Sequence, residues 1–226
     1  MIAVILLCLA ALAYILATLG FQFSLRQRAP EWLSHWNRLI GAGFALHSTG
    51  LLALAISLQR LPLETMKESI GILAWIIIAI HLLLAQPWKM ESLGSVAAPT
   101  AAVLTAVCAL TLGPDAPLPP RGPWFFLHVG SLTSSYACFS LAAGSAVLYF
   151  LQARRLKHKK INNSFRLPAL DSLDRAAYRF ILVGFPLLVI GIVSGMRITG
   201  WNWNWEERSK TVGSLACENL DFHSVF

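Results

Sequence analysis

The chain has 226 residues, of which 56% are hydrophobic and 13% are charged, and its formal net charge is +7. This composition, with a mean hydropathy of +0.62, leaves too little polar surface for a soluble globular domain and indicates an integral membrane protein. The four cysteines have no C-x-x-C spacing, so neither a disulfide framework nor a thiolate metal site is indicated.

Six apolar stretches approach or exceed the roughly 20 residues that a helix needs to cross a bilayer. They cover residues 2–23, 37–58, 70–86, 96–112, 125–152 and 176–198. The first stretch has no basic segment before it and no small-residue cleavage site after it, so we interpret it as a retained helix rather than a signal peptide. The predicted fold class is therefore all-α, a polytopic transmembrane helix bundle with about six spans.

Basic residues near the helix ends predict the orientation of this bundle, because lysine and arginine are retained on the cytoplasmic side. The connectors after the fifth and first stretches carry most of them: Arg154, Arg155, Lys157, Lys159, Lys160, Arg166 and Arg175, and Arg26, Arg28 and Arg38. Both connectors are expected in the cytoplasm, which places the N-terminus outside, together with everything after residue 198. The positive charge then reflects topology and contact with anionic lipid, and nucleic acid is not an expected partner.

No connector could hold a soluble domain, and no internal repeat is present. We divide the chain into three parts. Residues 1–36 are an N-terminal transmembrane helix with a basic cytoplasmic loop, residues 37–200 are the main membrane bundle, and residues 201–226 are an external tryptophan-rich segment with a tail of different composition.

His47 lies near the middle of the second stretch. An ionisable side chain at that depth is costly and usually functional. The neighbouring Gly41 and Gly43 would let another backbone or a flat ligand approach closely. The alternative is a neutral histidine that forms a hydrogen bond with a neighbouring helix. For His81, nearer the cytoplasmic end of the third stretch, we favour such a packing role.

His128 lies at the outer start of the fifth stretch, within the aromatic segment 124–129. It is expected near the same membrane face as the end of the sixth stretch. A neutral imidazole is the commonest ligand of haem iron, so His128 is a candidate axial ligand. The alternative is an interfacial histidine that forms a hydrogen bond with a loop carbonyl.

Three tryptophans alternate with asparagines directly after the sixth stretch: Trp201, Trp203 and Trp205. In an extended chain these three side chains share one face. They could form an aromatic shelf that lies flat against a large planar ring, while Asn202 and Asn204 face water. The alternative is an aromatic belt that anchors a helix end among the lipid headgroups.

Other functional classes lack the residues that they require. The chain has no P-loop, G-x-G-x-x-G, H-E-x-x-H or G-x-S-x-G motif. Acidic residues are absent from the six apolar stretches, which argues against an ion-coupled transporter built on membrane carboxylates. No residue is therefore assigned a catalytic role.

Several segments together carry a family pattern. They are F-A-L-H at 44–47, L-H-V at 127–129, Y-A-x-F at 136–139, L-Y-F-L-Q-x-R-R-L-K at 148–157, L-P-A-L-D-S-L-D at 167–174, Y-R at 178–179, G-F-P-L-L at 184–188 and G-I-V-S-G at 191–195. With these segments, which lie in most of residues 37–200, the chain resembles the haem-handling membrane proteins of cytochrome c assembly. These are of the CcsA, ResC and CcmC type, with HemX-like relatives. The run from Leu167 to Gly195 is the most specific part.

The resemblance implies a protein that carries haem b as its transported substrate. Family members have a tryptophan-rich external loop flanked by two external histidines, and two further histidines inside the membrane. His128 matches the first external histidine and His47 the first membrane histidine, so both are expected as axial ligands of the haem iron. Trp201, Trp203 and Trp205 are the expected haem-binding tryptophans.

The tryptophan-rich segment departs from the family pattern. Residues 203–206 fit its W-x-W-acid core, with glutamate in place of aspartate, but the Pro-Lys-Glu continuation is missing. Family members continue into further membrane helices that bring the remaining two histidines, whereas residues 207–226 contain no stretch that could span. We interpret the chain as a truncated or frame-shifted member, in which His223 is not expected to replace a ligand.

The function implied is haem delivery in cytochrome c biogenesis at the bacterial inner membrane, with haem presented on the outer face for covalent attachment to apocytochrome c. The chain would be at most a haem-presenting subunit of a cytochrome c synthetase. Expected partners are haem, apocytochrome c, membrane lipid and a second assembly subunit of the ResB type, with Arg197 or Arg121 pairing with haem propionates. The alternatives are a HemX-like membrane regulator of haem biosynthesis and an inactive truncated family member.

Overall fold

The computed structural model describes residues 1–27, 32–85, 87, 91–113, 122–157 and 169–199. Within these ranges the chain is helical and contains no strand. The helices are α1 (Ile2–Gln27), α2 (Leu33–Leu58), α3 (Met66–Ala85), α4 (Gly94–Thr111), α5 (Pro123–Lys157) and α6 (Leu170–Thr199), with the short 3-10 helix η2 (Glu91–Leu93) before α4. All six α-helices are long and apolar enough to cross a membrane, which confirms the predicted polytopic all-α fold.

The helices extend beyond the apolar stretches from which they were predicted. α2 begins at Leu33, α5 continues to Lys157 and α6 begins at Leu170. Backbone hydrogen bonding continues past the hydrocarbon layer, where polar side chains are solvated and no longer limit the helix. The predicted apolar stretches contain no acidic residue, but the longer helices do: Glu68 lies in the first turn of α3 and Asp171 in the first turn of α6, both within the spanning segments.

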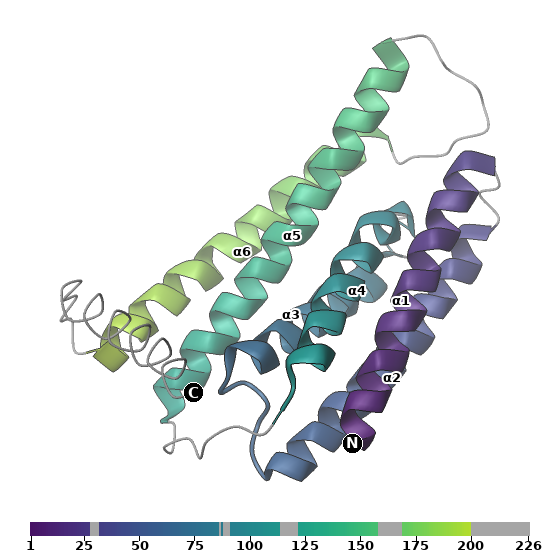
Figure 1. Cartoon of the computed structure of the whole chain (residues 1–226). Helices are drawn as coiled ribbons and strands as arrows, with labels where there is room; N and C mark the ends of the chain where they lie inside the picture. Colours follow the sequence, from purple (N-terminus) through teal and green to yellow (C-terminus); the bar gives the residue numbers. More distant parts are fainter. Residues whose placement is uncertain (28–31, 86, 88–90, 114–121, 158–168, 200–226) are drawn as a thin grey trace, which may run out of the picture.

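α1 to α4 form one bundle, in which α1 packs against α2 and α4, and α3 packs against α4 (Figure 1). α5 and α6 form a long antiparallel hairpin beside α3, and the extensive contacts of α6 are with α5. A continuous core of buried side chains joins the helices: Tyr14, Phe21, Ile40, Ile77, Ile78, Leu141 and Leu173. The α5–α6 hairpin therefore packs against α3 and shares one core with the other helices.

The alternating directions of the helices bring several chain segments to one end of the molecule, here named the outer end. It contains Met1, the connector from α2 to α3, the end of α4, the start of α5 and the end of α6 (Figure 1). The last turn of α5, with its basic residues, lies at the opposite end. The charge pattern predicts that the outer end faces away from the cytoplasm, and this orientation stays a prediction.

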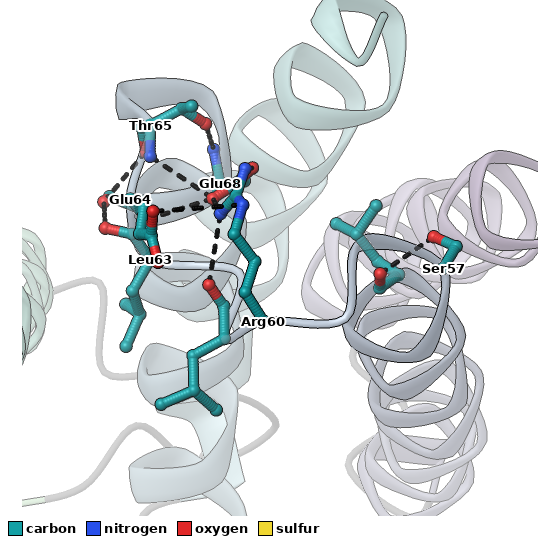
Figure 2. A network of polar contacts seen from close by, with 9 residues as sticks. Ser57, Arg60, Leu63, Glu64, Thr65 and Glu68 are labelled. Carbon is teal, nitrogen blue, oxygen red and sulfur yellow. Dashed lines mark hydrogen bonds and ion pairs between the residues drawn. The ribbon is translucent and has the colours of Figure 1, made fainter. Parts of the chain in front are cut away.

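A network of ionic and backbone hydrogen bonds fixes the start of α3 at the outer end (Figure 2). Arg60 donates two hydrogen bonds to the carboxylate of Glu68, with Nη1 2.9 Å from Oε2 and Nη2 2.8 Å from Oε1. The backbone N–H groups of Glu64 and Thr65 also donate to Glu68 Oε2, and Glu68 is 1% exposed. Because the Glu68 N–H lies 3.4 Å from Thr65 Oγ1, Thr65 and Glu68 form a reciprocal capping box.

Candidate functional site

His128 lies in the second turn of α5, at the outer end, and its ring packs against α6. Its Nδ1 atom is 2.6 Å from the carbonyl oxygen of Gly191. A carbonyl oxygen only accepts hydrogen bonds, so Nδ1 must carry the proton, and Nε2 of the neutral ring keeps its lone pair. Histidines that bind metals typically have this arrangement, with one ring N–H donated to a carbonyl and the other nitrogen left for the metal.

A cation and an indole lie beside His128. The guanidinium carbon of Arg197 in α6 is 5.9 Å from the ring centroid of Trp124, within the range of a cation–π contact. Trp124 precedes His128 by four residues, so both side chains lie on one side of α5. Trp124 is 50% exposed, which leaves part of the indole accessible. The α5–α6 hairpin thus presents an imidazole, an indole and a guanidinium at its outer end.

Trp124 and the Gly191 carbonyl are site groups that sequence reasoning did not identify. In the sequence, Trp124 stands out only as part of the aromatic segment 124–129, although its spacing of four residues from His128 places both on one helix face. The Gly191 carbonyl comes from a residue 63 positions away along the chain, and a backbone acceptor has no signal in the sequence.

His47 is buried in α2 and faces α1. Its Nδ1 atom is 3.5 Å from Tyr14 Oη, at the limit of a hydrogen bond, and its Nε2 atom has no partner among the described residues. Of the two small residues expected beside it, Gly43 is used for packing, since a Cβ atom there would lie 2.8 Å from Tyr14 Cε1. Gly41 has no atom within 4 Å of that position. The alternative role for His47 is a hydrogen bond with a neighbouring helix. The structure shows this bond as a long contact with Tyr14 of α1.

His81 lies near the opposite end of the bundle and is also fully buried. Its Nε2 atom is 2.9 Å from Oδ1 of Asn37 in α2, which is the interhelical packing contact expected of it. The Nδ1 atom of His81 and the Nδ2 atom of Asn37 have no partner among the described residues.

The structure does not bring all the predicted site residues together in one site. His47 faces α1 whereas His128 faces α6, and α2 and α5 have no extensive contact. Arg197 lies at the outer end, with its guanidinium over the ring of Trp124. Trp201, Trp203 and Trp205 lie outside the described residues, as does Arg121, so their place beside His128 stays a prediction.

Comparison with known proteins shows which family the chain is similar to. The model of the family described as cytochrome C assembly protein matches residues 63–209. The chain is similar to the cytochrome c biogenesis protein CcsA of Porphyra purpurea, with 28% identity and coverage of 65% of this chain and 60% of the relative. It is 31% identical to the CcsA of Thermosynechococcus vestitus, where the match covers 79% of this chain and 72% of the relative. No solved structure matches.

The family match covers some of the predicted site residues and not others. The chain spans about 60% of the length of the first of these relatives. The range matched by the family contains His128 and the three tryptophans of residues 201–205, whereas His47 precedes it.

Proposed function

Because the chain belongs to the cytochrome c assembly protein family, we propose that it binds haem at the outer end of the α5–α6 hairpin and presents it to apocytochrome c. The observation that carries this proposal is the hydrogen bond from His128 Nδ1 to the Gly191 carbonyl. It leaves Nε2 with an unprotonated lone pair at the end of the hairpin where α6 ends, next in sequence to the tryptophan segment. An imidazole nitrogen of this kind is the usual protein ligand of haem iron.

The surrounding groups fit a bound porphyrin. The half-exposed indole of Trp124 offers an apolar surface to the ring, and the predicted shelf of Trp201, Trp203 and Trp205 would offer another. Arg197 can pair with a haem propionate through charge-assisted hydrogen bonds. Haem b is the substrate of this site rather than a resident cofactor.

In the covalent step, each cysteine thiol of apocytochrome c adds across a vinyl group of the haem. A carbon–sulfur bond forms, the vinyl double bond is lost and the thiol hydrogen passes to the neighbouring vinyl carbon, so no oxidant is consumed. The reactive groups belong to the haem and the apocytochrome, while this chain supplies position and ligation. A ResB-type subunit that presents the apocytochrome is the proposed partner, in the bacterial inner membrane.

His47 is proposed as an earlier ligand on the path of the haem through the membrane. Its Nε2 atom is buried and has no hydrogen-bond partner in the part of the chain that the structure describes, and an unsatisfied buried polar atom destabilises the fold unless another group satisfies it. Haem would enter between the helices near His47 and then move to the outer end.

Complementation tests this function directly. The full chain is expressed in a bacterial strain that lacks its own cytochrome c assembly factor, and covalent attachment is measured as haem staining of cytochrome c in denaturing gels. We expect staining with the wild-type chain and with Gly130→Ala, where an added Cβ atom has no neighbour within 4 Å, and little staining with His128→Ala. A haem absorption band in the purified protein without such rescue would favour the HemX-like regulatory function, and absence of both would contradict haem delivery.

A further inference from the structure

Two hydrogen bonds from side chains of α5 to backbone carbonyls of α6 set the register of the hairpin. His128 Nδ1 donates to the Gly191 carbonyl at 2.6 Å, and Ser135 Oγ donates to the Gly184 carbonyl at 2.8 Å. The two donors and the two acceptors are each seven residues apart, which is close to two turns of an α-helix. Both bonds therefore lie along the same contact line between the antiparallel helices.

The side chain of His128 is larger than is needed to donate one interhelical hydrogen bond. Ser135 makes an equivalent link with a single hydroxyl group, whereas at position 128 an imidazole fills the interface. The Gly191 carbonyl also accepts a hydrogen bond from Ser194 Oγ at 2.9 Å, and Ser194 is 2% exposed. The acceptor of the His128 bond thus lies in a buried part of α6.

Gly195 gives the ring its space on α6. A Cβ atom at Gly195 would lie 2.6 Å from Cε1 and 2.7 Å from Nδ1 of His128, closer than real Cβ contacts. The Nε2 atom is 3.5 Å from the same point. The ring therefore turns its Cε1–Nδ1 edge toward α6, and Nε2 lies farther from the helix. Glycine in a helix interior is less stable than alanine. At position 195 this cost is offset because only a residue without a Cβ atom leaves space for the His128 ring.

We propose that Gly195 and the Gly191 carbonyl are positioning groups for His128, which hold the imidazole so that Nε2 is the nitrogen offered to the haem iron. This inference rests on the proposed function, in which His128 is the ligand. The helix that carries Arg197 therefore also sets the tautomer and the orientation of an imidazole carried by α5. Loss of a group that orients a ligating histidine typically lowers metal affinity by about 10-fold to 100-fold.

Gly195→Ala is the change that isolates this role. The added methyl group displaces the ring, so the bond from Nδ1 to the Gly191 carbonyl is lost and either ring nitrogen can meet the iron. In titrations of the purified protein with ferric haem, we expect affinity to fall by about 10-fold to 100-fold, with an altered axial-ligand signature in electron paramagnetic resonance. Gly130→Ala is the matched control, since a Cβ atom there has no neighbour within 4 Å. Ser135→Ala is a second control that removes the other interhelical bond.

A haem-free double-mutant cycle tests the same fit independently. Unfolding of the full chain in detergent is measured for wild type, Gly195→Ala, His128→Ala and the double variant. We expect Gly195→Ala to lower the unfolding midpoint or the yield when His128 is present, and to have little effect in the His128→Ala background, where the ring is absent. An equal loss in both backgrounds, or unchanged haem affinity and axial ligation in Gly195→Ala, would overturn the proposal. If wild type itself bound no haem, the proposed function would fail, while the cycle would still report whether Gly195 seats the ring.

Discussion

The Nδ1 atom of His128 donates a hydrogen bond to the backbone carbonyl of Gly191, 2.6 Å away across the α5–α6 interface. The sequence left two roles open for His128, an iron ligand or an interfacial histidine bonded to a loop carbonyl. The observed acceptor belongs to a helix, and the bond occupies only one of the two ring nitrogens. The two roles are therefore compatible, since the hydrogen bond orients the ring and Nε2 is left for a ligand.

His128→Asn is predicted to separate stability from haem binding. The asparagine amide can donate to the Gly191 carbonyl in place of Nδ1, but it has no imidazole nitrogen for the iron. We expect unfolding stability within about 1 kcal/mol of wild type, the usual net contribution of one hydrogen bond, together with a large loss of co-purified haem. Thermal unfolding in detergent and a pyridine haemochrome assay measure the two quantities. Wild-type haem content in this variant would contradict the ligand role.

The two buried histidines are predicted to have different roles: His81 stabilises the fold, whereas His47 binds haem. His81→Leu removes the 2.9 Å hydrogen bond to Asn37 and leaves that amide buried without a partner. We therefore expect a loss of about 1–3 kcal/mol in stability with no change in haem content. His47→Leu breaks a 3.5 Å contact with Tyr14, longer than the His81–Asn37 bond, so stability should fall less than in His81→Leu while haem content falls. The opposite pattern would assign the packing role to His47.

The Arg60–Glu68 network is predicted to stabilise the outer end strongly. Glu68 is 1% exposed, so Glu68→Ala removes the bidentate partner of Arg60, whose side chain is 22% exposed, together with the cap of α3, and should cost about 1–3 kcal/mol. Asp171 is the exposed control, because its ion pair with Arg175 is open to solvent and joins two residues of one helix, α6. Asp171→Ala should cost less than about 0.5 kcal/mol. Equal effects of both substitutions on the unfolding midpoint would mean that the network contributes no more than a surface pair.

The orientation of the bundle is predicted by the basic residues at the end of α5. In a background without native cysteines, Gly113→Cys at the outer end and Lys157→Cys at the opposite end are treated with a membrane-impermeant maleimide. Because basic segments stay in the cytoplasm, we expect labelling of position 113 in intact spheroplasts and of position 157 only after permeabilisation. The reverse pattern would place His128 on the cytoplasmic side and exclude presentation of haem outside.

The six helices could be predicted because a chain inside a bilayer must satisfy its backbone hydrogen bonds within each segment. Their ends could not, because hydropathy reports the hydrocarbon layer and not where helical bonding stops, as at Leu33 and Lys157. One boundary does have a signal in the sequence, since the T-x-x-E pattern from Thr65 to Glu68 marks the start of α3 as a capping box.

The candidate site could be predicted only in part. Topology alone places His128 at the same end as the last turn of α6, since the helices alternate in direction. Its partner could not be identified from the sequence, because the acceptor is a backbone carbonyl and depends on the register of two helices. The spacing of Gly184, Gly191 and Gly195 was a usable hint, since the three lie on the side of α6 that contacts α5.

The absorption spectrum of the purified protein tests the central claim most directly. Wild type is predicted to show a Soret band from bound haem, His128→Gly to lose most of it, and added imidazole to restore it by occupying the space of the missing side chain. A wild-type protein without a Soret band, or a His128→Gly variant with an unchanged spectrum, would contradict the account.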